Sequence, residues 1–133
     1  MPSGDGVQGY FQHDRGGEKM AESFDAVIIG TGPGGEEVAD RLIDGGRSVA
    51  LVERELMGGE CPYWACIPSK ALLRPTEAQA ESRRAFGVGT PELDWKETAE
   101  YRDFIVRHLD DSGTADGYEK KGATIVRGAG RIT

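Results

Sequence analysis

Two cysteines, Cys61 and Cys66, lie five positions apart and are the residues of this sequence best suited to chemistry. A structural zinc site would need two further cysteine or histidine ligands, but the two histidines, His13 and His108, are distant in sequence. Two interpretations remain: a pair of unrelated buried thiols, or a redox pair that cycles between dithiol and disulfide. We therefore expect no metal site.

A disulfide between these cysteines would require an irregular helical turn. In an ideal helix a five-residue offset separates side chains by about 7.5 Å along the axis and about 140° around it, whereas a disulfide needs Cα atoms within about 7 Å. Pro62 and Pro68 favour such irregularity, because each lacks a backbone donor. The start of a helix lowers thiol pKa values, and Lys70 adds a positive charge one turn after Cys66. The alternative for Lys70 is a solvated surface side chain.

A second motif, residues 30–35 (GTGPGG), has the G-x-G-x-x-G spacing of a dinucleotide-binding turn. Its first glycine permits a tight turn, its second lets a pyrophosphate approach the backbone, and its third lets a helix pack on the strand. Pro33 suits the first helical turn, whose free N–H groups attract phosphates. Glu53 follows Gly35 by 18 positions and suits the hydroxyls of a ribose. A helix-packing turn with an incidental glutamate is the alternative, and the spacing does not distinguish FAD from NAD.

The elements that would position these motifs form a β-α-β unit. Residues 24–29 and 48–52 are short apolar runs typical of strands that are buried on both faces of a parallel sheet. Between them, residues 38–43 have the apolar spacing of one helix face, and the helix should end at residues 44–46. This order predicts an α/β, Rossmann-like fold.

Beyond the cysteines the sequence predicts further alternation of helix and strand. The expected elements are a helix over 71–85 kinked or interrupted by Pro75, a break at 87–91, a helix over 94–110, a short polar helix or turn at 118–121 and a strand at 123–126. The spacing places Tyr101, Phe104, Ile105 and His108 on one face of the helix over 94–110. On such a face His108 is expected to be packed or partly exposed rather than to bind a ligand.

The composition is that of one small domain or a piece of one. The 133 residues are 38% hydrophobic and 29% charged, and no apolar run approaches the roughly 18 residues of a membrane span. The net charge of −7 argues against nucleic acid or an anionic membrane as a partner. Residues 1–23 lack apolar periodicity and the apolar core of a signal peptide, so we expect a flexible extension and a cytoplasmic location.

Three segments together resemble the N-terminus of the FAD-dependent pyridine nucleotide-disulfide oxidoreductases, the family of dihydrolipoyl dehydrogenase and of mercuric and mycothione reductases. The segments are residues 30–35, 49–53 and 58–73. The resemblance implies that residues 24–133 are the N-terminal segment of a Rossmann-like FAD-binding domain with a redox-active cysteine pair. The domain would be incomplete, because family members are much longer.

The same resemblance assigns roles to individual residues. The FAD pyrophosphate would lie along the glycine turn, the adenosine ribose at Glu53, and the flavin ring beside Cys66 and Lys70. Cys61 would be the interchange thiol that meets the substrate. The other cofactor-binding residues that it implies are Gly30, Gly32, Pro33, Gly34, Gly35, Gly58, Gly59, Glu60 and Gly130.

The implied function is that of a flavoprotein that passes electrons between NAD(P)H, FAD and a Cys61–Cys66 disulfide, to or from a small thiol or disulfide substrate. The full-length protein would be a homodimer, NAD(P)H would bind a domain absent from this chain, and the fragment would be inactive alone. Two departures bear on the substrate and cofactor: residues 62–65 (PYWA) between the cysteines are bulky, and Glu60 is acidic. Two alternatives stay open, a reductase of quinones or other small acceptors with the same fold, and a non-catalytic nucleotide-binding remnant.

Overall fold

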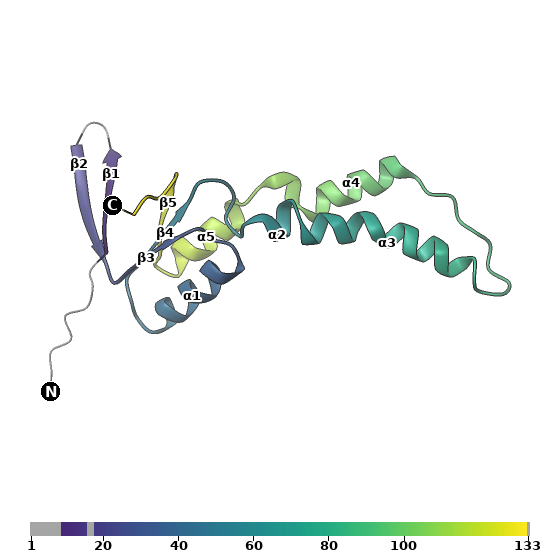
Figure 1. The fold of residues 1–133 in the computed structure, drawn as a ribbon, viewed down its shortest axis with the longest axis horizontal. Coiled ribbons are helices and arrows are strands. Elements are labelled where there is room, and N and C mark those ends of the chain that lie inside the picture. Colours follow the sequence, from purple (N-terminus) through teal and green to yellow (C-terminus); the bar gives the residue numbers. More distant parts are fainter. Residues whose placement is uncertain (1–8, 16–17, 133) are drawn as a thin grey trace.

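The computed structural model describes residues 9–15 and 18–132. A parallel sheet of three strands lies in its α/β body, in the order β3 (Ala26–Ile29), β4 (Val49–Glu53) and β5 (Thr124–Arg127) (Figure 1). Because the strands are parallel, their carboxyl ends meet at one edge, where Glu53 is the register partner of Arg127. The α/β fold class and both strands of the predicted β-α-β unit are confirmed. The expected burial on both faces holds for β4 but is wrong for β3, which is partly buried and ends in Ile29 at 49% exposed.

Helix α1 (Pro33–Asp44) connects β3 to β4 and completes that unit. Every residue of β4 is buried, which explains why its sequence is apolar without alternation. Ala39 of α1, Val49 and Leu51 of β4, and Tyr118 of α5 (Ser112–Lys120) belong to one core cluster. Helix α5 is longer than the predicted polar segment 118–121. Its early turns are polar and only Tyr118 of the helix is buried, so the sequence has no apolar spacing there that would indicate a helix.

The structure differs from the expected flexible extension at the N-terminus. Strands β1 (Gly9–Arg15) and β2 (Glu18–Phe24) form an antiparallel hairpin in which Gly9 pairs with Phe24 and Arg15 with Glu18. Residues 1–8 and 16–17 of the predicted extension lie outside the described residues. A Gly-Gly dipeptide between two candidate strands is a hairpin signal, which the polar composition of the segment obscured.

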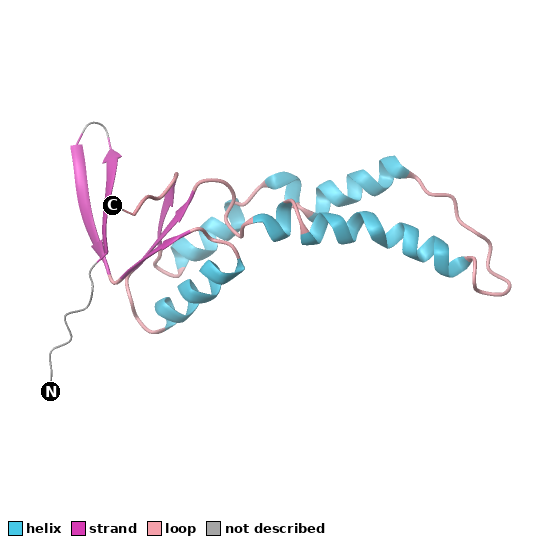
Figure 2. Cartoon of the chain, in the orientation of Figure 1, coloured by secondary structure: helices cyan, strands magenta, loops and turns pink. Residues whose placement is uncertain are grey.

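A pair of helices extends away from the sheet on the side opposite the hairpin (Figure 2). After the short helix α2 (Glu60–Tyr63), α3 (Cys66–Ser82) runs out and α4 (Trp95–Ile105) returns beside it. Helix α3 begins earlier than predicted and passes through Pro75 without interruption. The proline removes one backbone donor, and next to it the Thr76 hydroxyl donates to the Leu73 carbonyl at 2.6 Å.

Helix α4 ends earlier than predicted, because the chain turns into left-handed conformation at Arg107, His108 and Leu109, with φ of 54°, 51° and 63°. The predicted helix face does not pack at Tyr101 and Phe104, which are 51% and 67% exposed. His108, which was expected to be packed or partly exposed, is exposed. The buried positions of this region are Thr98 and Val106.

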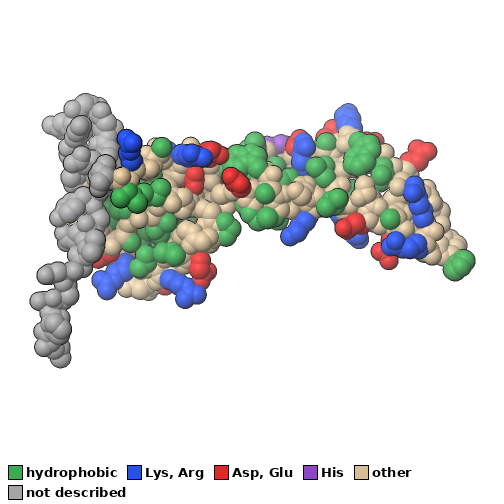
Figure 3. Space-filling view, viewed as in Figure 1, with side chains coloured by type: hydrophobic (Ala, Val, Ile, Leu, Met, Phe, Trp, Pro, Cys, Tyr) green, Lys and Arg blue, Asp and Glu red, His purple; other side chains and the backbone are tan. Residues whose placement is uncertain are grey.

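The surface carries charged side chains of both signs along the face seen in Figure 3, interspersed with apolar side chains on the body and on the helical pair. Within the described part of the chain, no helix combines the length and the apolar character needed to cross a membrane.

Candidate nucleotide and thiol site

The glycine turn joins β3 directly to α1. Gly30 has a φ of 90°, which favours glycine, and its N–H donates to the Val52 carbonyl at 2.8 Å. A Cβ on Gly35 would overlap the Gly30 carbonyl oxygen, so only glycine lets the helix lie so close to the strand. These positions match the roles predicted for the first and last glycines of the motif.

The amino end of α1 has the features that a pyrophosphate needs. Pro33 is at the start of the helix, and Gly32 at the N-cap contributes no side-chain hydrogen bond to the first turn. A Cβ on Gly32 or Gly34 would have no atom of the protein within 4 Å. The turn therefore leaves open space at Gly32 and Gly34 beside the start of a helix, so these residues fit the pyrophosphate of a dinucleotide.

Glu53, at the end of β4, is 8% exposed, and its carboxylate is held by backbone and side-chain donors. Oε2 accepts from the Thr31 N–H and the Thr31 hydroxyl, both at 2.8 Å, and Oε1 accepts from the Glu55 N–H at 2.9 Å. Burial raises the pKa of Glu53, but these hydrogen bonds outweigh burial and hold it below its ordinary value. Glu53 is therefore anionic and held against the glycine turn.

A cavity of about 260 Å³ opens at the carboxyl ends of the strands, where open α/β sheets bind ligands. It brings together Gly30, Glu53 and Gly130, three residues that the sequence assigned to one cofactor. Gly130 lies against Ile29, because a Cβ there would come 3.0 Å from the Ile29 side chain. The cavity suits the adenosine end of a dinucleotide.

The segment before Cys61 packs on the glycine turn. Gly59 has a φ of 74°, and a Cβ on it would lie 2.7 Å from the Gly32 Cα. The Gly58 N–H donates to the Thr31 carbonyl at 3.0 Å. Glu60 then begins α2 and is exposed. Helix α2, which carries Cys61, is thereby held next to the nucleotide turn.

The two cysteines flank a break between helices, as the sequence predicted. Cys61 belongs to α2 and Cys66 begins α3, and at Ala65 between them the backbone leaves helical conformation, with φ −121° and ψ −93°. Both side chains are free thiols, and Cys66 is exposed.

The pKa of Cys61 is raised, against the sequence-based expectation of a lowered thiol pKa. Hydrogen bonding with the Cys66 side chain is the largest cause, followed by burial and by the charge of Cys66, while Lys70 acts in the opposite direction. The helix-start argument overlooked the second thiol, whose hydrogen bond and charge disfavour the thiolate of Cys61.

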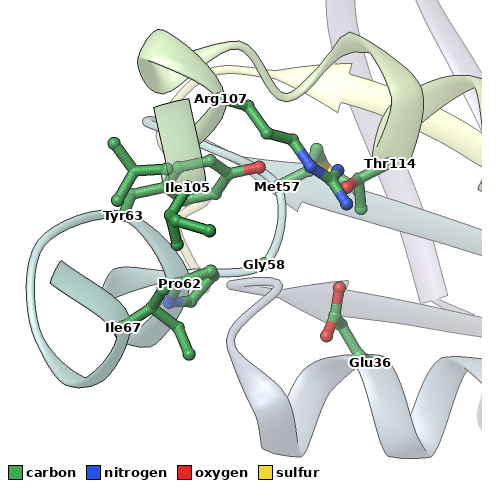
Figure 4. A pocket seen from close by; sticks show the side chains of 10 residues that line it. Glu36, Met57, Gly58, Pro62, Tyr63, Ile67, Ile105, Arg107 and Thr114 are labelled. Carbon is green, nitrogen blue, oxygen red and sulfur yellow. The ribbon is translucent and has the colours of Figure 1, made fainter. Parts of the chain in front are cut away.

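A larger cavity of about 390 Å³ lies beside α2 and the start of α3 (Figure 4). Pro62 and Ile67, the residues directly after the two cysteines, line it together with the buried Met57. Glu36 and Arg107 add opposite charges from α1 and from the left-handed segment. Burial, and then the charge of Asp40, raises the pKa of Glu36.

The described residues contain no group of three or more His, Cys, Asp or Glu side chains that could hold a metal ion.

A family model described as "Pyridine nucleotide-disulphide oxidoreductase" matches residues 24–132. The chain belongs to this family. The membership confirms the family that the three sequence segments indicated.

Proteins named "Dihydrolipoyl dehydrogenase" are among the relatives of this family member. The one from Rhizobium etli is 59% identical over 71 residues, which cover 52% of this chain and 15% of that protein. Those from Bacillus subtilis and Zymomonas mobilis are 38% and 37% identical over 118 and 119 residues, covering 85% and 86% of this chain and 24% and 25% of theirs. The chain thus spans about a quarter or less of the length of these relatives.

In this member of the family, the sequence alone did not indicate several residues of the site. Thr31 is fully buried and bonded to Glu53, and its place inside the glycine motif was the one available signal. Glu36 and Arg107 are brought to the same cavity only by tertiary packing. Asp111 and Arg127 form an ion pair behind the site, and no spacing rule links them.

Proposed function

We propose that this chain is the FAD-and-disulfide part of a flavoprotein oxidoreductase. The protein would pass electrons between NAD(P)H, FAD and the Cys61–Cys66 pair, to or from a small thiol or disulfide substrate, as a dihydrolipoyl dehydrogenase does. The observation that carries the proposal is the seat of Gly59 on Gly32, which holds the thiol-bearing helix against the nucleotide turn.

The proposed cofactor is FAD, with NAD(P)H as a co-substrate bound outside these 133 residues. Gly30, Gly32, Pro33, Gly34 and Gly35 would hold the pyrophosphate, Glu53 and Gly130 the adenosine end, and Gly58, Gly59 and Glu60 the stretch toward the flavin. FAD, when bound, would supply two-electron exchange with NAD(P)H. Lys70, whose charge lowers the pKa of Cys61, would stand near the reacting groups.

The thiols would act by exchange with a disulfide. The Cys61 thiolate attacks one substrate sulfur, and the other substrate sulfur leaves and takes up a proton. The Cys66 thiolate then attacks the sulfur of Cys61 and displaces the substrate sulfur that is still bonded to it. This sulfur also takes up a proton, and a Cys61–Cys66 disulfide forms. Two electrons and two protons restore the thiols. The pKa of Cys61, which is raised first of all by hydrogen bonding with the Cys66 side chain, supports this pairing.

The cavity beside the thiols is the proposed approach for the substrate. Its apolar wall of Met57, Pro62 and Ile67 suits an aliphatic body, and Arg107 suits an acidic end. We propose a homodimer for the complete protein and a cytoplasmic location, a compartment in which thiols stay reduced.

FAD titration of the full chain, followed by flavin fluorescence, tests this function. Gly59→Ala should weaken binding about tenfold or more, because the added methyl must displace the Gly32 backbone. Gly87→Ala is the matched control: Gly87 also has a positive φ of 78°, but a Cβ there meets nothing within 4 Å.

A variant with both cysteines replaced by serine separates the alternatives in the complete protein. It should keep FAD and lose disulfide reduction. Full reduction of quinones or other small acceptors by this variant, with no disulfide activity in the wild type, would identify a small-acceptor reductase instead. A wild type that takes up no FAD would leave the non-catalytic remnant.

A further inference from the structure

Asp111 stands at the N-cap of α5, but its side chain makes no capping bond to that helix. Oδ2 accepts instead from the Met57 N–H at 2.6 Å and from Arg127 Nη1 at 2.5 Å, and Oδ1 accepts from Arg127 Nη2 at 3.0 Å. An aspartate at this position normally accepts from the first turn of its own helix. Here the carboxylate is directed to residues that are distant in sequence.

The ion pair joins three segments: the loop after β4, the start of α5 and the end of β5. Arg127 Nη1 also donates to the Glu55 carbonyl at 3.3 Å, so the guanidinium spans from α5 to that loop. Asp111 is 9% exposed and its bond from the Met57 N–H is buried, whereas the Arg127 side chain is 44% exposed. Bidentate pairing of this kind fixes orientation as well as distance.

We propose that Asp111 and Arg127 form a clasp that positions the nucleotide turn and the thiol helix relative to each other. The proposal rests on the proposed function, because it concerns the placement of the FAD site and of Cys61. Met57, whose N–H the clasp holds, directly precedes Gly58 and Gly59. Without that anchor, the seat of Gly59 on Gly32 would depend on the Gly59–Gly32 contact and the hydrogen bond from Gly58 to Thr31.

The clasp also reaches the other end of the cofactor site. Gly128 follows Arg127 directly, and its N–H donates to the Glu53 carbonyl at 2.8 Å. Gly128 and Gly130 line the cavity that contains the Glu53 side chain. One ion pair thus anchors both the loop of the adenosine cavity and the loop that leads to Cys61, although no atom of the pair belongs to the turn itself.

A purely structural ion pair would lower stability when broken and change nothing else. Asp111→Asn and Arg127→Lys are the test variants, because asparagine keeps an acceptor for the Met57 N–H and lysine keeps the charge. Asp110→Asn is the matched control. Asp110 is the neighbour of Asp111, but its carboxylate accepts from the Ser112 N–H at 2.9 Å and not from the loop that contains Met57. All are made in the full chain and measured where circular dichroism shows them folded.

Two readouts are compared, the FAD dissociation constant and the pH profile of Cys61 alkylation by iodoacetamide, followed by mass spectrometry. Both clasp variants should weaken FAD binding about tenfold and move the Cys61 profile toward that of an ordinary thiol, because α2 loses its fixed place beside Cys66. Asp110→Asn should match the wild type in both.

Clasp variants that are less stable but keep wild-type FAD affinity and the wild-type alkylation profile would overturn the inference. A wild type that binds no FAD while the alkylation profile still shifts in the variants would reject the proposed cofactor and retain the clasp. The two failures are therefore distinguishable.

Discussion

At the scale of single residues, the site depends on where two ionisable side chains obtain their hydrogen bonds. Glu53 takes three, two of them from Thr31, and its pKa is lowered despite burial. The pKa of Cys61 is raised, first of all by hydrogen bonding with the Cys66 side chain. The carboxylate is therefore held charged, whereas the thiol stays protonated to a higher pH than usual.

Glu53→Gln should destabilise the fold by about 1–3 kcal/mol, because an amide has one acceptor oxygen and its NH₂ group would face either the Thr31 donors or the Glu55 N–H. The effect depends on pH. A pKa that is lower in the folded than in the unfolded state gives stability above about pH 4.3, which is lost as the pH falls through the folded value. Urea unfolding between neutral and acid pH should show a shallower acid decline in the variant. Equal declines would show that Glu53 does not contribute to it.

Cys66→Ala should lower the pKa of Cys61 toward its ordinary value, because the hydrogen bond and the charge that raise it are removed. The rate of Cys61 alkylation should then rise at pH values below the wild-type midpoint. Lys70→Gln is the opposing control and should raise the pKa of Cys61 further. A Cys61 profile that is unchanged in Cys66→Ala would show that Cys66 does not raise the pKa of Cys61.

At the scale of elements, the left-handed segment Arg107–Leu109 stores backbone strain between α4 and the start of α5. Three consecutive non-glycine residues with positive φ are uncommon, and each costs about 1–2 kcal/mol. The turn redirects the chain so that Arg107 faces the cavity beside the thiols. Its position, directly after the buried Val106, explains why a helix predicted to residue 110 ends at Ile105.

His108→Gly should therefore stabilise the protein by about 0.5–1 kcal/mol, since glycine adopts this conformation without strain but loses more entropy on folding. Tyr101→Gly, at an exposed position within α4, should instead destabilise it by about 1 kcal/mol. Chemical denaturation measures both. Loss of stability in His108→Gly would mean that the left-handed segment carries no strain.

The elements that sequence reasoning predicted well are those with local signals. An unbroken apolar run indicates strand β4, and a fixed glycine spacing indicates the glycine turn. Residues whose roles come from tertiary partners gave no such signal: Asp111 and Arg127 are 16 positions apart. The interruption predicted at Pro75 does not occur, because packing of α3 on α4 overrides the loss of one backbone donor.

At the scale of the whole molecule, the nucleotide site draws its residues from positions 30 to 130, so nearly the entire α/β body must be folded to form it. Ligand binding at such a site should stabilise the body as one cooperative unit. The thiols, in contrast, lie at the junction between the body and the helical pair (Figure 1). The two parts of the site can therefore be probed by ligands of different length.

ADP should bind the glycine turn and the cavity at Glu53 and Gly130, and raise the unfolding temperature, because this half of the site is complete without the thiols. At a hundred times its Kd it should stabilise the fold by about 2.7 kcal/mol. It should not slow the alkylation of Cys66, which is exposed at the start of α3, whereas FAD should both stabilise the fold and protect this thiol. Protection by ADP equal to that by FAD would place the thiols beside the adenosine half and reverse the direction of the bound dinucleotide.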